Sequence, residues 1–417
     1  MEKLRKFIQQ REFLKFFLMF FSGTLLAQVI TIALSPVLTR IYKPEDFGVY
    51  GVYVSIVSLL IAFVTGRYEY AINSTKNDED AISIFKIVNY LSFFSSGFIF
   101  AVVVLLGDTL TELFKLNVDK SLLYFIPLTL LLMGLLQGSV YYLNRHKKIG
   151  ILSKSKILQS ISNGTFSIVA GVMNFGTIGL IVANIVGLFA SQLYQRVRGI
   201  KGNKFEVDRE RMKKNLKKYK QYPIFNAPSS FFDNLSIQAP VFILLKFFSE
   251  SVVGFYSLTV RVIGMPLGLI STSISQVFMS QVSELHRNNK SYKHIIIKLA
   301  KYLALIGLIP LIILSIWGPT LFARVFGDNW YEAGEYARIL TIGYYFKFVV
   351  SPLSIVFFIN QKVKLLSVIQ TTRAITTVLI LIIFATKFEV EMVLFAYTIH
   401  EVIFYLGYFY FILKTSK

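Results

Sequence analysis

Five basic side chains lie within or at the edges of long apolar stretches: Arg261, Arg373, Lys347, Arg67 and Lys86. A charged side chain at the centre of a bilayer costs about 2.5–3.5 kcal/mol on insertion scales, so it should face a cavity or a partner. Arg261 is the strongest candidate, because it lies about ten residues, or ~15 Å, inside its stretch. These cations predict a binding site at membrane depth.

Each of these cations also has an ordinary structural interpretation. Lys347 lies among aromatic residues that would pack as a core. Arg67 and Lys86 lie nearer the ends of their stretches, where a long side chain can reach the membrane interface. Arg67 could also form a local ion pair with Glu69.

Asp233 is the one acid that we place inside a span, against three basic residues. A buried carboxylate can carry a proton or a sodium ion, which makes Asp233 the candidate for ion coupling. An ion pair with Arg261 would account for Asp233 equally well, and it is the structural alternative for Arg261. The expected polar lining of the cavity consists of Gln28, Asn234 and Gln370.

The elements that must position these residues are membrane helices. Of the 417 residues, 54% are hydrophobic and only 16% are charged, whereas an ordinary soluble chain has about 25% charged residues. Runs such as Phe98–Leu106, Leu303–Trp317 and Val378–Ala385 form the centres of stretches that alternate with short basic loops. About 20 apolar residues in a helix cross a bilayer core.

The alternation predicts an all-α polytopic membrane protein with about twelve transmembrane helices. The expected spans are 13–39, 47–66, 81–106, 121–143, 151–173, 176–195, 222–247, 252–283, 295–317, 336–359, 365–386 and 390–413. No cleavage site follows the basic N-terminus, so we expect the first apolar segment to be retained. The chain has no cysteine, which excludes disulfides and thiolate metal sites.

Most of the 44 Lys and Arg residues lie on the loops of one side. This asymmetry places both termini in the cytoplasm. It also explains the net charge of +21 without nucleic acid. The densest basic run gives a cytoplasmic linker at 199–221 between an N-terminal lobe, 1–198, and a C-terminal lobe, 222–417. The run could contact anionic lipid or a soluble partner, although setting the topology explains it more simply.

An internal repeat supports two six-helix lobes around a central cavity. At an offset of 206 positions, Gly48-Val49-Tyr50 aligns with Gly254-Phe255-Tyr256, and Arg40 aligns with Lys246. Six spans return the chain to the same side, so both lobes would have the same orientation. Binding sites in such transporters lie between the repeats.

Three blocks resemble bacterial polysaccharide repeat-unit flippases of the O-antigen (Wzx) type. They are Ser22–Ile56, Val253–Leu285 and Phe326–Leu340. The superfamily of these flippases also contains drug/sodium antiporters and the peptidoglycan-precursor flippase. The resemblance implies transport of undecaprenyl-pyrophosphate-linked oligosaccharides from the cytoplasmic to the periplasmic leaflet of the bacterial inner membrane, for O-antigen or lipopolysaccharide biosynthesis.

On this interpretation the cations would contact the pyrophosphate or its sugars. The expected partners are the lipid-linked glycan, membrane lipids and other polysaccharide assembly proteins, with no cofactor, metal or nucleic acid. A multidrug/cation antiporter of the same fold is the alternative, but it would favour an acidic cavity. A membrane polysaccharide polymerase, an enzyme, would need a larger outer loop than about 318–335. Asp78-Glu79-Asp80 has the form of a glycosyltransferase motif, but acids at that place favour a helix N-terminus.

Overall fold

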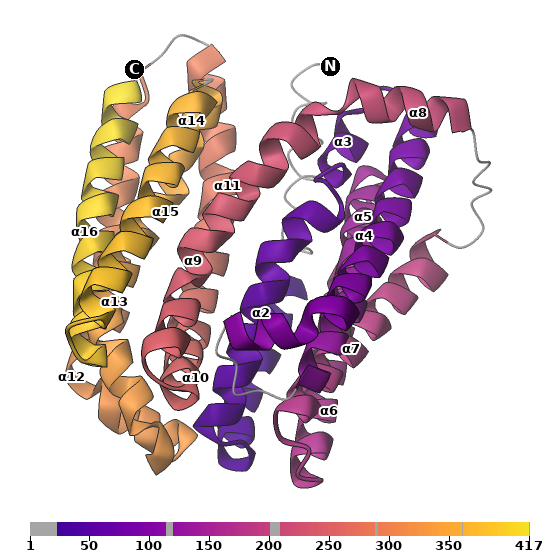
Figure 1. The fold of residues 1–417 in the computed structure, drawn as a ribbon. Helices are drawn as coiled ribbons and strands as arrows, with labels where there is room; N and C mark the ends of the chain where they lie inside the picture. Colours follow the sequence, from indigo (N-terminus) through magenta and orange to yellow (C-terminus); the bar gives the residue numbers. More distant parts are fainter. Residues whose placement is uncertain (1–22, 114–119, 201–208, 288–290, 361, 417) are drawn as a thin grey trace. The chain divides into compact units, whose positions relative to one another are not determined.

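The computed structural model describes the chain except for residues 1–22, 114–119, 201–208, 288–290, 361 and 417. The described residues form helices joined by short turns and contain no strand (Figure 1). The chain divides into two compact units. Unit 1 consists of Met1–Ile41 and Tyr53–Phe231, and unit 2 consists of Tyr42–Val52 and Phe232–Lys417. The predicted lobe boundaries stay predictions.

Unit 1 begins with the helix Gly23–Ile41. Its further elements are α2 (Pro44–Val64, shared with unit 2), α3 (Glu69–Ser74), α4 (Asp78–Leu113), η1 (Lys120–Tyr124), α5 (Phe125–Arg145), α6 (Ile149–Val172), α7 (Gly176–Gln195), η2 (Arg196–Ile200), α8 (Arg209–Lys218) and η3 (Tyr222–Asn226). Its buried core joins α3, α4, α5 and α8 through Ile72, Ile84, Leu143 and their neighbours.

Unit 2 is formed mainly by six long helical segments, some of them interrupted. Its elements are α9 (Ala227–Phe247, which begins in unit 1), α10 (Glu250–Thr259), η4 (Val260–Gly264), α11 (Met265–Arg287), α12 (Lys293–Phe326), η5 (Asp328–Trp330), α13 (Tyr331–Val350), η6 (Ser351–Ile355), α14 (Val356–Ile359), α15 (Val363–Ala385) and α16 (Val390–Thr415). One core cluster joins α11, α12, α14 and α16 through Val282, Ile296, Phe357 and Ile412.

Ten helices of the described residues are long and apolar enough to cross a membrane. This finding confirms the all-α polytopic class, whereas the count of twelve stays a prediction. The two predicted spans outside the ten coincide with α6 and α9. Both helices carry several hydroxyl and amide side chains, such as Ser153 and Gln159 in α6 and Asn234 and Gln238 in α9, and these lower their hydropathy.

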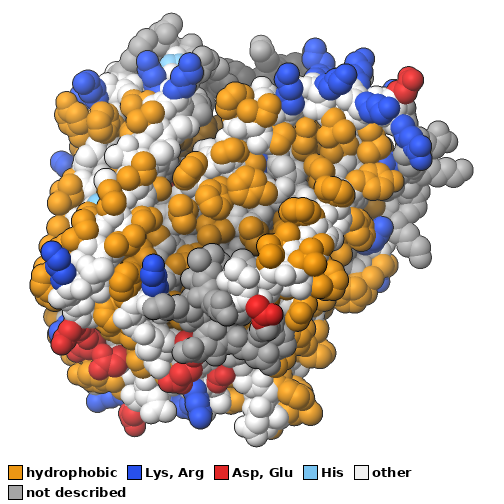
Figure 2. All heavy atoms as spheres, viewed as in Figure 1, with side chains coloured by type: hydrophobic (Ala, Val, Ile, Leu, Met, Phe, Trp, Pro, Cys, Tyr) orange, Lys and Arg blue, Asp and Glu red, His pale blue; other side chains and the backbone are white. Residues whose placement is uncertain are grey.

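Helix exposure separates a periphery from an interior. In α4 and α12 only 17% of the apolar window is buried, against 56% for the helix that contains α5. Leu105 of α4 and Leu305 of α12 are among the large apolar side chains that remain exposed. Figure 2 shows such hydrophobic side chains over much of the visible surface. Apolar exposure of this extent is expected where helices face lipid.

The first turns of α2 and α10, both in unit 2, touch at residues that the repeat makes equivalent. A Cβ on Gly48 would lie 1.9 Å from the Glu250 oxygen, and a Cβ on Gly254 would lie 1.9 Å from the Pro44 oxygen. The Ser251 hydroxyl donates to Glu45 at 2.5 Å, across the same separation of 206 positions. Contacts between equivalent residues indicate a local two-fold axis through this helix crossing, which supports the internal repeat.

Candidate functional site

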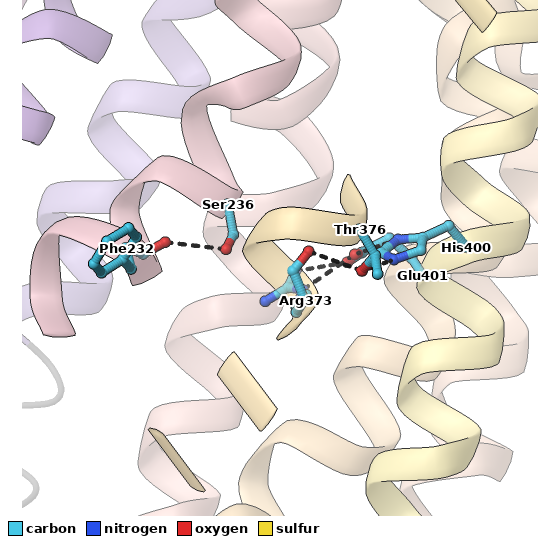
Figure 3. Close-up of polar contacts among 6 residues, drawn as sticks. All are labelled: Phe232, Ser236, Arg373, Thr376, His400 and Glu401. Atoms are coloured by element: carbon cyan, nitrogen blue, oxygen red, sulfur yellow. Dashed lines mark hydrogen bonds and ion pairs between the residues drawn. The ribbon is translucent and has the colours of Figure 1, made fainter. Parts of the chain in front are cut away.

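The best-defined polar arrangement in unit 2 joins Arg373 of α15 to Glu401 of α16 (Figure 3). The guanidinium donates from Nε to Oε1 at 3.1 Å and from Nη2 to Oε2 at 2.6 Å. Only 5% and 6% of the two side chains are exposed. Two parallel charge-assisted hydrogen bonds hold both groups in a fixed orientation. Arg373 is therefore neutralised within the protein.

Neighbouring side chains complete this arrangement. Arg373 lies over the rings of Phe404 and Tyr405, 5.2 and 5.4 Å from their centroids. The hydroxyl of Thr376 is 2.8 Å from Nε2 of His400, whose Nδ1 lies 3.6 Å from Glu401 Oε1. Thr376 follows Arg373 by one turn of α15, so a single helix face presents both groups to α16. The geometry is suited to an orienting network.

Lys347 of α13 lies near the same group. Its ammonium is 5.5 Å from the centroid of the Tyr344 ring, as expected from its aromatic surroundings. The charges of Arg373, Glu401 and Asp233 all act on it. Lys347 is half-buried and has no direct ion pair among the described residues. The structure thus places Lys347 within electrostatic range of two other predicted residues, Arg373 and Asp233.

Arg261 lies in η4, a π-helical segment between α10 and α11. Single π turns inside α-helices are frequent at functional sites. The guanidinium is 5.4 Å from the centroid of the Phe47 ring, which packs against Trp330 at 5.0 Å. The side chain is half-buried. Among the residues that the structure describes, no ion pair joins Arg261 to Asp233.

In unit 1, Arg67 and Glu69 form the local ion pair that their spacing suggested. Arg67 Nη1 lies 3.5 Å from Glu69 Oε1, and the side chains are 13% and 1% exposed. Neither carboxylate oxygen of Glu69 has a hydrogen-bond partner in the described part of the chain. Arg67 also lies 5.6 Å from the Tyr70 ring centroid. Gly66 and Arg67 both have φ of 57°, which forms the turn between α2 and α3.

The remaining predicted residues are spread over both units. Lys86 is half-buried in α4 and Asn234 is half-buried in α9, and both have interaction partners. Gln370 lies one turn before Arg373, with its buried Oε1 free of hydrogen bonds to the described residues. Gln28 is half-buried on the helix Gly23–Ile41, near Thr31. Thr31 is 3.0 Å from Ser160 of α6, which is an inter-helix contact.

Two charged residues within helices were missed in the sequence analysis. The prediction that Asp233 is the one acid within a span is wrong, because Glu401 lies buried in the middle of α16. A single carboxylate in a long apolar and aromatic span was the available signal. Lys156, which is not among the five candidate cations, lies inside α6 and donates from Nζ to Thr24 Oγ1 at 2.9 Å. Unit 1 therefore also contains a cation within one of its long helices.

The geometry suits binding of charged or polar groups, because charged and aromatic side chains gather in unit 2. The described residues include no group of three or more His, Asp or Glu side chains that could hold a metal ion. Within the spans of unit 2, the site residues carry a net formal charge of +1. The cations are Arg261, Lys347 and Arg373, and the acids are Asp233 and Glu401. What the arrangement provides is a set of cations, aromatic faces and amides at membrane depth.

Solved structures with a similar fold are membrane transporters and flippases. The lipid II flippase MurJ, in an inward closed conformation, has a TM-score of 0.73 at 15% identity over 94% of this chain and 86% of that one. A multidrug resistance MATE family transporter in an inward-facing conformation has a TM-score of 0.65 at 14% identity, over 92% and 93%. A transporter of the MOP superfamily from Pyrococcus furiosus has a TM-score of 0.53 at 12% identity, over 95% of this chain and 94% of that one.

At these identities the likeness establishes the fold. No curated protein matches the chain by sequence. A family model described as "polysaccharide biosynthesis protein" matches residues 37–335, well over half of the 417 positions. These findings agree with the resemblance that the three sequence blocks carry. The chain belongs to this family of polysaccharide biosynthesis proteins and has a fold also found in transporters and flippases.

Proposed function

We propose that this protein moves undecaprenyl-pyrophosphate-linked oligosaccharide repeat units from the cytoplasmic to the periplasmic leaflet by alternating access of its two lobes. Family membership supports a role in polysaccharide biosynthesis. The fold supports transport or flipping. The substrate must carry a diphosphate and sugars through hydrocarbon, which requires cationic and polar side chains at membrane depth.

Arg261 carries this proposal. Its guanidinium is held over Phe47 and has no carboxylate partner among the described residues. A cation on an aromatic face keeps its donors available to an incoming anion. Because Arg presents a planar fork, it can bind two phosphate oxygens at once. We assign Arg261 the principal contact with the diphosphate.

The other predicted residues take secondary roles. Lys347 would add a point charge beside the same substrate group. Arg373 is already paired with Glu401, so it would contact substrate only if that pair opened. Gln370, Asn234 and Gln28 would hydrogen-bond sugar hydroxyls. Asp233 remains our candidate for coupling to a proton or sodium ion.

In unit 1, Arg67 and Lys86 would meet the head group as it enters from the cytoplasm. This role assumes that both termini are cytoplasmic, as the distribution of Lys and Arg predicts. The protein would then lie in the bacterial inner membrane. The expected product is O-antigen or a similar polysaccharide, assembled with other membrane proteins of the same pathway.

A cation antiporter remains the second candidate, because unit 2 contains two acids, Asp233 and Glu401. Glu401 makes a bidentate bond to Arg373, which leaves it little capacity for a cationic drug. A deletion strain separates the candidates. Undecaprenyl-linked single repeats on the cytoplasmic leaflet, with surface polysaccharide lost, would support the flippase. Unchanged polysaccharide with altered drug sensitivity would support the antiporter, and short surface chains would indicate a polymerase.

The residue-level test is Arg261→Ala in the deletion strain. We expect surface polysaccharide to fall by about ten-fold or more, since a hydrogen bond to a charged group contributes about 1.5–3 kcal/mol. Arg261→Lys should retain part of the activity. Arg338→Ala is the matched control, because Arg338 is 51% exposed and pairs locally with Glu335. Normal polysaccharide from Arg261→Ala at wild-type expression would remove Arg261 from the substrate site.

A further inference from the structure

Helix α8 (Arg209–Lys218) is amphipathic, with one face fixed to unit 1. Its Asn215 is buried, and Met212 and Leu216 pack against the core that includes Tyr219. Figure 1 shows α8 lying across the ends of α3 and α4. The helix is thus an element of unit 1 with a defined inner and outer face.

Polar contacts fix the orientation of α8. Arg211 pairs with Glu79, and the Asn215 amide donates to Asp80 Oδ1 at 3.2 Å. The Tyr68 hydroxyl donates to the Leu216 carbonyl at 3.0 Å. Glu79 and Asp80 at the start of α4 are therefore engaged with α8 residues other than its exposed lysines, and Asp78 pairs with Arg145 of α5. These acids do not neutralise the outer face of α8.

The outer face carries four exposed lysines, Lys213, Lys214, Lys217 and Lys218, which we name the α8 lysine surface. Among the described residues none of the four has an ion pair, and Lys218 lies 5.0 Å from the Tyr219 ring centroid. Figure 2 shows basic side chains in a row along the edge where α8 lies in Figure 1. Like charges this close together repel, so the surface favours an anionic partner.

Exposed apolar side chains lie a short distance after the lysines in the chain. In η3, Ile224 and Phe225 are 53% and 69% exposed. Clusters of lysines beside membrane helices attract anionic lipid head groups, and exposed apolar side chains nearby favour the interfacial layer of a membrane. There the ammonium groups reach lipid phosphates while the apolar residues enter the boundary of the acyl chains. A soluble acidic protein would explain the lysines but would leave these two side chains without a role.

We propose that the α8 lysine surface, with Ile224 and Phe225, binds the head groups of anionic phospholipids. It would do so on the membrane side where the basic loops gather. The surface holds no part of the candidate substrate site, so the inference stands whether or not the protein is a flippase. Its effect would be to hold unit 1 against the lipid interface and to enrich anionic lipid beside it.

The test uses the full chain purified in mixed micelles with equal phosphatidylglycerol and phosphatidylcholine. Native mass spectrometry counts the lipids that each protein retains. Wild type should retain phosphatidylglycerol preferentially. The variant K213Q/K214Q/K217Q/K218Q should retain at least about five-fold less of it. Gln is a good helix former and leaves the inner face intact, so α8 should persist.

The matched control removes four exposed lysines of unit 2, as K293Q/K298Q/K301Q/K364Q. Phosphatidylglycerol retention by this control should fall by less than about two-fold, because its lysines are spread over two helices rather than gathered on one helix face. Equal losses in both variants would overturn the proposal, as would equal retention of the two lipids by wild type. If the four-site variant fails to fold, K214Q/K218Q should still halve retention, and no change would count against the surface. An acidic protein bound without lipid preference would also overturn it.

Discussion

The two units each bury an arginine–carboxylate pair, and the two pairs differ in construction. In unit 1, Arg67 and Glu69 are two positions apart, with one contact of 3.5 Å and no hydrogen bond to the carboxylate from the described residues. In unit 2, Arg373 and Glu401 come from different helices and make two hydrogen bonds of 3.1 and 2.6 Å. Burial is similar for both carboxylates, so the difference lies in geometry.

Sequence separation explains the difference. Arg67 and Glu69 are two positions apart on a tight turn, where Arg67 has a φ of 57°, and they make one contact of 3.5 Å rather than two parallel hydrogen bonds. Side chains on two packed helices can approach end to end, which allows the bidentate form. The pair in unit 1 lies within one turn and does not connect separate helices. The pair in unit 2 connects α15 to α16, and its two hydrogen bonds occupy both the guanidinium and the carboxylate.

The largest expected effect comes from breaking the pair in unit 2. Glu401→Ala would leave the Arg373 guanidinium buried without a carboxylate, which costs about 3–5 kcal/mol for pairs of this type. We expect the free energy of unfolding, measured by denaturing-detergent titration in mixed micelles, to fall by that amount. Surface polysaccharide should fall with it.

The double variant R373M/E401L distinguishes charge from packing. Removing both charges with apolar residues of similar volume is often neutral or stabilising, so most of the lost stability should return. A double variant as unstable as Glu401→Ala would show that shape, not pairing, holds α15 to α16. A loss of less than about 1 kcal/mol in Glu401→Ala would contradict the assigned role of the pair.

The same contrast explains what the sequence could predict. Apolar runs identify the helices because hydropathy is a local property. They predict the part of each helix that lies in the membrane, but not the residues at which the helix begins and ends. The span predicted at 295–317 thus continues as α12 to Phe326, where Gly327 with φ of 107° ends it. The repeat could also be detected in the sequence, because Gly48 and Gly254 are equivalent under the offset of 206 positions. In the structure both glycines lie where α2 and α10 touch.

The candidate site was only partly predictable. Arg67 and Glu69 could be paired from their spacing, and Arg373 could be noticed as a cation within a span. Glu401 was missed because one acid barely changes the mean hydropathy of a long aromatic helix. Its partner lies 28 positions away, and only the packing of α15 on α16 brings the two together. Pairing between helices is a property of the fold, so sequence patterns do not reveal it.

A smaller effect should follow from loosening the network around Glu401. Thr376→Val keeps the volume but removes the hydroxyl that contacts His400 at 2.8 Å. We expect a loss of about 0.5–1.5 kcal/mol, the usual range for one hydrogen bond. Thr372→Val, at an exposed position of the same helix, is the control and should change little. Equal values for both variants would mean that His400 does not help to orient Glu401.

The smallest effect is expected in unit 1, from Glu69→Gln. The substitution removes the charge and keeps the shape. Because the carboxylate gains no hydrogen bond from the described residues, its attraction to Arg67 mainly offsets the cost of burial. Arg67 also keeps its position 5.6 Å from the centroid of the Tyr70 ring when the acid is neutral. We therefore expect the free energy of unfolding to change by no more than about 1 kcal/mol. A loss of about 3 kcal/mol or more, equal to that from Glu401→Ala, would show that the turn between α2 and α3 depends on its ion pair as strongly as α15 and α16 depend on theirs.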